Sequence, residues 1–553
     1  MCKRGRTIVS KDTLENENIP MQEPINLEQF SPKIPKYTAL SFAPMPNFIE
    51  KSRRLRELYG ASQILSYLSW KIVRAAQNKG VEVILPAIAN DDIVQGIPSH
   101  ILVMGNFSCS EALKALMEGW EDIVNTCYEW LQENLNSELP ELTNSTEWAV
   151  AWTKWKMQPW GIFWGDGETI ETALQDLEAR KLRRDWGESK ETTKETTKDS
   201  SQLPDRLHSQ LHKGTITHKN KDKLRLSTTE IKRIYQCIAK ILDPAIKGND
   251  FIPINKSEGI NILELIKRLV TYEAIAKKIH RDFYSPRFRE MLLRDENRGG
   301  TYWNAWFMGD GDRVNARLTK LKDRANLTQF SHSLRAWGKN FSTEVDRGLM
   351  AYVGGYDFLG VMHREQESAQ LKSQGAIEWL IDLHASWQQE NLGIILSVGF
   401  VWAGHLVSPR DILRHCREAE KFANHFAAGQ RDRVTIRILF DNGQYVQWTT
   451  PWQYLQWLAD YRDRDGNRGK DANWSHSYTN LLQLKAQDWS LPTPSTQTDE
   501  AIALNLFGLY FGSDKQEILS QERSAIVGAE DPQSFIAWIE GIIQVGWHLC
   551  SNI

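Results

Sequence analysis

The segment 303–362 constrains the fold most, because two short apolar runs in it each lead into glycine and acidic residues. The run 349–353 stops at Gly354 and Gly355, and a glycine pair suits a hairpin tip because glycine adopts positive φ without strain. We therefore expect an antiparallel strand pair here, with residues 358–362 as the returning strand. The other run, 306–308, is predicted to be a strand that ends at Asp310.

If these strands lie side by side, Asp310, Asp312 and Asp357 gather at one end of a sheet. Mg²⁺ takes oxygen ligands from one or two carboxylates and from substrate phosphates, so this arrangement suits a metal site. A pair of such ions can activate a hydroxyl for in-line attack on a nucleotide. An ordinary solvated acidic turn explains the same residues as well, because short acidic and glycine motifs are common by chance.

A chain of 553 residues is too long for a single core, so three or four domains are expected. The net charge is −3, and any contact with RNA must therefore come from local basic patches such as 51–56 and 180–184. Solvated helix faces explain such runs more often than phosphate sites do.

The six cysteines are scattered and form no CxxC pair, which favours a reducing compartment and argues against a zinc ribbon. No apolar run approaches the roughly 18 residues that a membrane-spanning helix needs, and the N-terminus has no apolar signal core. We expect a cytoplasmic protein.

Composition and periodicity predict an α+β chain with two α/β parts. In the first part, a strand, a helix, two strands and a helix are predicted, which make half of a ferredoxin-like sandwich; they cover residues 37–43, 47–79, 81–85, 101–104 and 111–135. In the second part, we expect helices at 368–389 and 409–427 and strands at 394–402, 434–440 and 445–449, the last two joined by an Asn-Gly hairpin. Residues 165–168 (Gly-Asp-Gly-Glu) are predicted to form a loop without metal.

Several motifs together resemble one family. Gly354, Gly355, Tyr356 and Asp357 resemble the GGDD signature of palm-type nucleotidyl cyclases, and the Asp-Gly-Asp at 310–312 resembles the acidic motif that precedes it. Further segments are similar to the large subunit of type III-B CRISPR effectors (the Cmr complex, "Cas ten" family), namely 54–70, 80–86, 96–100, 397–405, 415–421 and 545–550. The resemblance runs from about residue 37 to the C-terminus, with one linker excepted.

This resemblance implies two ferredoxin-like palm domains with a helical insert and an all-α C-terminal domain. The expected boundaries are a polar arm at 1–36, a first palm at 37–186, a low-complexity linker at 187–226, the insert at 227–296, the second, GGDD-like palm at 297–458 and the helical domain at 459–553. It also implies an RNA-binding ribonucleoprotein of antiviral defence, with guide RNA, target RNA and other Cmr subunits as partners.

The resemblance further assigns roles to residues of the second palm. Asp310 and Asp357 would be catalytic, and Asp310, Asp312 and Asp357 would hold Mg²⁺ or Mn²⁺. Gly354, Gly355, Tyr356 and Lys421 would bind ATP as ligand or substrate.

The chain departs from the family pattern at Tyr356, where an acidic residue is expected to join the metal ligands. A phenol has a pKa near 10, so it supplies a neutral oxygen where two cations need negative charge. We therefore expect a degenerate cyclic oligoadenylate synthetase site that is weak or inactive. The alternatives are an active, target-RNA-triggered synthetase and, more distantly, a stand-alone GGDEF-like cyclase. The sequence contains no His-Asp dipeptide, so no HD-type nuclease activity is expected, and it lacks the zinc cysteines that relatives often carry.

Overall fold

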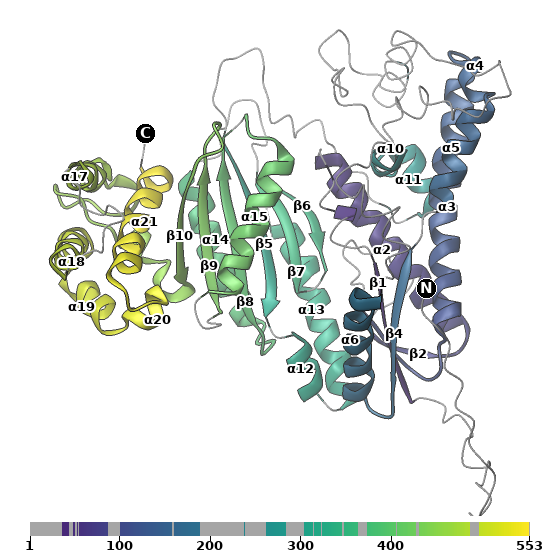
Figure 1. The fold of residues 1–553 in the computed structure, drawn as a ribbon, viewed down its shortest axis with the longest axis horizontal. Helices are drawn as coiled ribbons and strands as arrows, with labels where there is room; N and C mark the ends of the chain where they lie inside the picture. Colours follow the sequence, from purple (N-terminus) through teal and green to yellow (C-terminus); the bar gives the residue numbers. More distant parts are fainter. Residues whose placement is uncertain are drawn as a thin grey trace, which may run out of the picture.

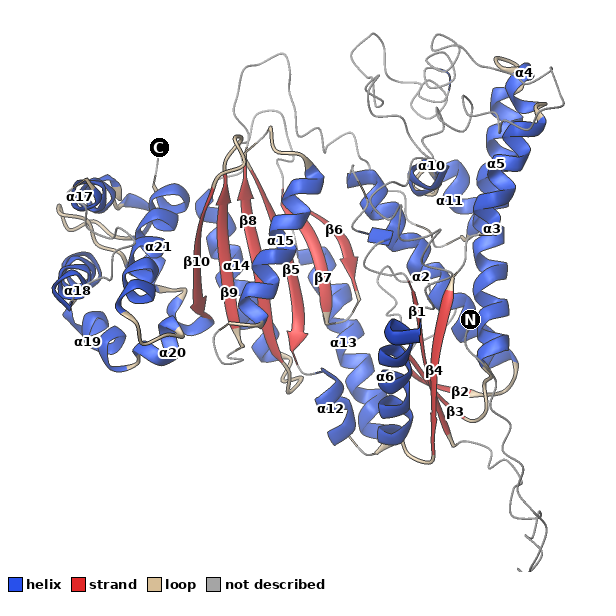
Figure 2. Cartoon of the chain, in the orientation of Figure 1, coloured by secondary structure: helices blue, strands red, loops and turns tan. Residues whose placement is uncertain are grey.

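The computed structural model describes residues 36–43, 48–49, 52, 55–86, 100–157, 160–187, 237, 262–281, 283, 303–312, 314–321, 323–344, 348–354, 356–362, 373–404, 406–426, 431–486 and 497–551. Two β-sheets lie side by side with helices between and around them, and a group of helices follows the second sheet (Figures 1 and 2). The predicted mixed α/β class is confirmed. Almost all of the predicted arm and linker, and the residues of the predicted helical insert other than 237, 262–281 and 283, lie outside the described residues.

The first sheet has four strands in the order β2-β3-β1-β4, and every pairing is antiparallel. The strands are β1 (Tyr37–Ala43), β2 (Glu82–Leu85), β3 (Ile101–Met104) and β4 (Gly161–Gly167). Helix α2 (Leu55–Asn78) connects β1 to β2, and α3 (Cys109–Leu135) with α4 (Pro140–Thr143) and α5 (Thr146–Lys156) connects β3 to β4. The predicted helices and strands of this part are therefore confirmed.

The prediction of a loop at 165–168 is wrong, because Gly165, Asp166 and Gly167 belong to strand β4. Helix α6 (Ile170–Gly187) follows and packs directly on this strand. A Cβ on Gly165 would overlap the backbone of Leu177, and one on Gly167 would overlap that of Ala173. The two glycines thus permit a close helix–strand approach and do not form a turn.

The helices α10 (Ile262–Leu269) and α11 (Glu273–Ile279) pack on α2 and α3 of the part that contains the first sheet, called here the first unit. Arg268 pairs with Glu57 of α2, whose side chain is fully buried, and Arg268 Nε lies 2.8 Å from Glu57 Oε1. A Cβ on Gly60 would overlap the carbonyl of Lys267, so the two helices touch backbone to backbone there.

The second sheet has six strands in the order β10-β9-β8-β5-β7-β6. Its strands are β5 (Asn304–Asp312), β6 (Gly348–Val353), β7 (Asp357–Met362), β8 (Ile395–Ala403), β9 (Arg433–Leu439) and β10 (Tyr445–Pro451). Only the β8–β9 pairing is parallel among the described strands. All of these strands were expected from the sequence, whereas α12 (Val314–Lys320) and α13 (Arg324–Glu344), which follow β5, were not.

Helices cover both faces of the second sheet (Figure 1). On one face, α13 and α14 (Ser373–Gln389) pack against Phe307, Phe358 and Phe400. On the other, α15 (Pro409–Asn424) packs against Trp306 and Val401. At Gly399 of β8 the helix α15 comes so close that a Cβ would lie 2.5 Å from the carbonyl oxygen of Cys416.

The C-terminal part is helical, as expected. It contains α17 (Ser475–Lys485), α18 (Gln497–Phe511), α19 (Ser513–Gln521), α20 (Arg523–Val527) and α21 (Pro532–Cys550). Helix α21 lies against β10, where Trp538 Nε1 donates a hydrogen bond of 2.9 Å to the carbonyl of Thr449. No helix in the described part of the chain is both long and apolar enough to cross a membrane.

We expect Gly399→Ala to destabilise the protein by ~1–3 kcal/mol, because the added methyl overlaps the backbone of α15 and neither element can move cheaply. The matched control is Gly375→Ala in α14, where a Cβ meets nothing within 4 Å and helix propensity predicts a gain of up to ~1 kcal/mol. Urea-induced unfolding of both variants measures the difference. Equal stabilities would show that α15 does not rest on β8 at this glycine.

Candidate functional site

Strand register brings two acidic residues of the second sheet together. In the β5–β7 pairing Asp310 lies opposite Asp357, and in the β5–β8 pairing it lies opposite Ser397. Because residues directly opposite each other in neighbouring strands project to the same face, the three side chains share one face of the sheet. This is the face that α15 covers.

The turn between β6 and β7 is bound tightly to β5. Gly311 N donates to the carbonyl of Tyr356 at 2.9 Å, and Gly354 N donates to the carbonyl of Asp357 at 2.7 Å. A Cβ on Gly354 would overlap the hydroxyl end of Tyr352, so glycine is needed for this close approach. Gly355, the second glycine of the predicted pair, lies outside the described residues.

Asp357 and Asp310 form a hydrogen-bonded pair of acids. Burial raises the pKa of Asp357 well above its ordinary value, and the hydrogen bond and charge of Asp310 raise it further. Two adjacent carboxyl groups of like charge favour sharing one proton. The predicted neighbourhood of Asp310 and Asp357 is therefore present in the structure.

Asp312 lies on the same strand but in a different environment. Its side chain is fully buried; Ser397 Oγ donates to one oxygen, and Arg431 Nη1 lies 3.2 Å from the other. Burial raises the pKa of Asp312, whereas Ser397, Arg431 and the backbone N–H of Asp432 lower it. Protein donors thus already satisfy this carboxylate.

Two residues of α15, Glu420 and Asn424, complete the group and were missed by sequence reasoning. Asn424 Nδ2 lies 3.3 Å from Asp310 Oδ2 and 3.3 Å from Glu420 Oε1. Burial and, next, the charge of Asp310 raise the pKa of Glu420 to about 7. Lys421, the predicted nucleotide-binding lysine, is exposed on α15 beside Glu420, and its charge lowers the pKa of that acid.

Tyr356 lies at the boundary between the two sheets. With Leu102 and Leu174 of the first unit and Leu334 of α13 it lines an apolar cavity of about 50 Å³. Burial and then the charge of Asp357 raise the pKa of its phenol well above 10, so the hydroxyl stays neutral. The residue at the third position of the GGDD-like motif therefore adds no negative charge to the acidic group.

The acidic pair by itself supplies only part of a metal-ion shell. No group of three or more His, Cys, Asp or Glu side chains in the described part of the chain is arranged to hold a metal ion. Asp310 and Asp357 do touch, however, and two carboxylates with substrate phosphates are a common Mg²⁺ shell.

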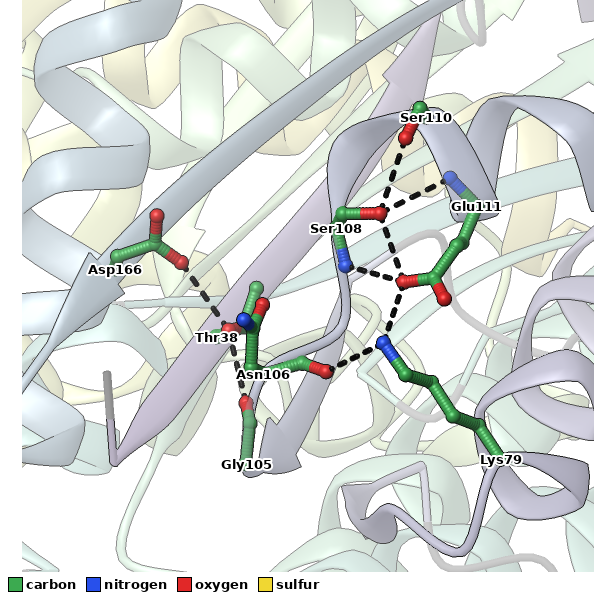
Figure 3. A network of polar contacts seen from close by, with 8 residues as sticks. All are labelled: Thr38, Lys79, Gly105, Asn106, Ser108, Ser110, Glu111 and Asp166. Atoms are coloured by element: carbon green, nitrogen blue, oxygen red, sulfur yellow. Dashed lines mark hydrogen bonds and ion pairs between the residues drawn. The ribbon is translucent and has the colours of Figure 1, made fainter. Parts of the chain in front are cut away.

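The first sheet also places an acid opposite a residue of a neighbouring strand (Figure 3). Asp166 of β4 lies opposite Thr38 of β1, whose hydroxyl donates to Asp166 Oδ1 at 3.1 Å and lies 3.0 Å from the carbonyl of Gly105. Nearby, Lys79 pairs with Glu111 at 2.8 Å, in the capping box that Ser108 forms at the start of α3. By strand order this β1–β4 pair corresponds to the β5–β8 pair of the second sheet, in which Asp310 lies opposite Ser397, so each of the two pairs joins an acid to a hydroxyl residue.

Comparison with known proteins gives one family. Residues 37–232 match the model of "CRISPR-associated protein Cmr2, N-terminal". None of the curated proteins has a significantly similar sequence.

Several solved structures are similar to this chain at low sequence identity. The Csm1-Csm4 cassette in complex with cA4 has a TM-score of 0.46 and 15% identity, with 92% of this chain and 69% of that chain covered. The cassette in complex with AMPPNP has a TM-score of 0.46 and 15% identity, with 94% and 70% covered. The Csm1-Csm4 subcomplex of the type III-A CRISPR-Csm interference complex has a TM-score of 0.45 and 13% identity, with 92% and 69% covered.

We expect Glu420→Gln to stabilise the protein at pH 8 by ~1–3 kcal/mol and much less at pH 5. The pKa of this acid is raised in the folded state, so the unfolded chain loses its proton first and stability falls as the pH rises from 4.5 to about 7. Glutamine is neutral throughout and removes this loss. Urea-induced unfolding at both pH values measures the effect.

The matched control for this prediction is Glu129→Gln, at an exposed position of α3. It should change stability little at either pH. A Glu420→Gln variant with the same pH dependence as the natural chain would show that Glu420 is not close to the acidic pair.

Proposed function

We propose that the chain is the large subunit of an RNA-guided type III-B CRISPR effector, because residues 37–232 match the model of the Cmr2 N-terminal family. Its partners would be guide RNA, target RNA and the other Cmr subunits, and its role antiviral defence in the cytoplasm. In the second sheet it would carry a nucleotide-binding site of degenerate, weak or inactive cyclic oligoadenylate synthetase type.

The order of strands supports a pair of palm domains. In the first sheet β1, α2, β2, β3, α3 and β4 give the spatial order β2-β3-β1-β4. In the second, β5, α13, β6, β7, α14 and β8 give the equivalent order β6-β7-β5-β8. Both are β-α-β-β-α-β units of ferredoxin-like type. We therefore assign palms to 37–186 and 297–458, with 227–296 as insert and 459–553 as C-terminal helical domain.

The observation that carries the proposed nucleotide site is the pairing of Asp310 with Asp357 beside Gly354. A bound divalent cation would supply charge neutralisation and polarise the phosphate. Asp310 and Asp357 would hold it, and Gly354, Gly355 and Tyr356 would contribute to the binding of ATP. Lys421, exposed next to Glu420 on α15, would pair with a phosphate oxygen.

Two features indicate that nucleotidyl transfer from ATP is weak at this site. Asp312, the third predicted metal ligand, is already satisfied by Ser397 and Arg431, and Tyr356 remains neutral in an apolar cavity. A two-cation transfer would thus have only two of its carboxylates, and several kcal/mol of charge stabilisation would be lost at the reacting centre. We propose that ATP binds while synthesis is slow or absent.

An active synthetase is the second candidate, and the pairing of Asp310 directly opposite Asp357 favours it. A pair of crowded acids destabilises a sheet unless a ligand relieves it. The stand-alone cyclase explains neither the first sheet nor the C-terminal helices.

The test is to incubate the reconstituted complex, its guide and cognate target RNA with ATP and Mg²⁺ or Mn²⁺ and to measure cyclic oligoadenylates. We expect little or no product from the natural chain and about 10–100-fold more from Tyr356→Asp, because a carboxylate restores negative charge near Asp357. Tyr356→Phe, which removes only the hydroxyl, should stay as low as the natural chain.

Asp310→Ala controls for structural damage, because it should leave assembly of the complex intact. Abundant product from the natural chain would favour the active synthetase. If neither the natural chain nor Tyr356→Asp makes cyclic oligoadenylates, the subunit is a scaffold. Failure of the natural chain to assemble on guide RNA would refute the proposed function altogether.

A further inference from the structure

A cavity of about 460 Å³ lies where the C-terminal end of α15, the edge strand β10 and the start of α21 meet. Pockets that bind small molecules or cofactors commonly have volumes of roughly 300–1,000 Å³. The described residues that line this cavity include no Asp, Glu, Lys or Arg. Four of them are aromatic, namely Phe422, Phe426, Trp448 and Trp538. The cavity is therefore chemically distinct from the acidic group around Asp310.

The aromatic residues of the cavity form two pairs. The ring centroids of Phe422 and Phe426 are 5.7 Å apart, and those of Trp448 of β10 and Trp538 of α21 are 5.5 Å apart. Trp538 is fixed, because its Nε1 donates a hydrogen bond of 2.9 Å to the carbonyl of Thr449. Phe422, in contrast, is 47% exposed. An aromatic ring is thus available to a planar ligand at the rim of an apolar cavity.

Two polar side chains of the same cavity offer hydrogen bonds. Arg437 Nε donates to Gln447 Oε1 at 2.6 Å, which turns the oxygen of this amide toward the guanidinium. The amide nitrogen Nε2 then remains a donor, and the described part of the chain gives it no acceptor. His425 Nδ1 lies 3.3 Å from the carbonyl of Lys421, which leaves Nε2 for a ligand. A flat apolar surface with a few hydrogen-bonding groups suits a nucleobase, because each base has a π face and a polar edge.

A row of basic side chains on α15 and its C-cap leads to this cavity. The row consists of Arg410, Arg414, Arg417, Lys421 and His425. Intervals of three or four residues place them along one face of the helix, and all except the half-buried Arg417 are exposed. The acids beside the row are already paired, since Ser408 Oγ donates to Asp411 at 2.7 Å and Arg437 lies 2.8 Å from Glu418. Such a row matches the phosphates of a nucleic-acid strand, whereas an apolar peptide would fill the cavity without using the charges.

We propose that the cavity takes an unpaired base of single-stranded RNA, whose backbone follows the basic row of α15. Phe422 would stack on the base, and Gln447 and His425 would bind its edge. Arg410 and Arg414 would contact phosphates. This inference rests on the proposed function, which supplies RNA as a partner, and it adds a base-binding site between the second sheet and the C-terminal helices.

The first experiment measures the fluorescence anisotropy of a short labelled oligoadenylate with the full chain, in EDTA so that no metal ion contributes. Phe422→Ala should bind it about tenfold more weakly, because the ring on which a base stacks is lost. Phe422→Tyr keeps a ring and should bind as the natural chain does. The matched control is Leu509→Ala, which removes an exposed apolar side chain of α18 and should change nothing. A strand of the same length without bases should bind equally to all four proteins.

The second experiment tests the basic row by the salt dependence of binding. The double variant Arg410→Gln with Arg414→Gln should lower the slope of log affinity against log salt concentration by about 1.4, because each phosphate contact to a single strand contributes about 0.7. Lys114→Gln, at an exposed position of α3, should leave the slope unchanged. Lys421 is kept in these variants, because it belongs to the proposed ATP site.

Three results overturn the proposal. They are a natural chain that does not bind the oligoadenylate, a Phe422→Ala variant of unchanged affinity, and a Phe422→Ala variant that loses affinity equally for the strand without bases. The last result would mean that the ring supports the surface and does not receive a base. An unchanged salt slope of the double arginine variant would refute the basic row as the path of the backbone.

A crosslinking experiment on the reconstituted complex identifies the strand. Thiouridine is placed in the guide RNA or in the target RNA, and crosslinks to residues 422–426 show which strand enters the cavity. A complex that assembles on guide RNA but crosslinks neither strand there would refute the cavity and leave the effector subunit. Failure to assemble would refute the proposed function, whereas base-dependent binding of oligoadenylate by the chain alone would still support the cavity.

Discussion

The end of the second sheet depends on one unfavourable pairing, that of Asp310 with Asp357 across β5 and β7. Like charges directly opposite each other destabilise a sheet, so the surrounding structure must relieve them. It does so through a shared hydrogen bond, a raised pKa of Asp357 and the amide of Asn424. The amide reaches the pair because Gly399 lets α15 lie directly on β8. The close packing of α15 at Gly399 and the buried amide of Asn424 thus both act on this pair of carboxyl groups.

Local pattern was sufficient to predict this pairing from the sequence. Alternation and apolar runs located β5, β6 and β7, and the glycines at 354–355 placed the turn, so Asp310 and Asp357 were expected at one end of a sheet. The same rule failed at β4, where Gly165 and Gly167 look like turn residues. There the glycines permit α6 to touch the strand, which is a tertiary requirement that resembles a turn in the sequence. Helix α13 was missed although its buried residues recur at helical spacing, from Leu327 and Phe330 to Leu334, Trp337 and Phe341.

The rest of the site could not be predicted, because it depends on which face of α15 meets the sheet. Periodicity marks the apolar face of that helix but does not show that Glu420 and Asn424, more than 100 residues from Asp310, will lie beside it. Arg431 is equally remote in sequence and reaches Asp312 only through the parallel β8–β9 crossover. For Tyr356 the sequence indicated only that a metal ligand is lost. The structure shows that its ring lines a cavity together with Leu102 and Leu174, which no local pattern could predict.

The two sheets can be compared pair by pair. They share one order of strands, and each places an acid of one strand opposite a residue of a neighbouring strand. In the first sheet that residue is Thr38, which donates a hydrogen bond to Asp166 and leaves no conflict of charge. The second sheet also pairs two acids, Asp310 and Asp357, across β5 and β7, and this pairing is the feature on which the proposed nucleotide site rests.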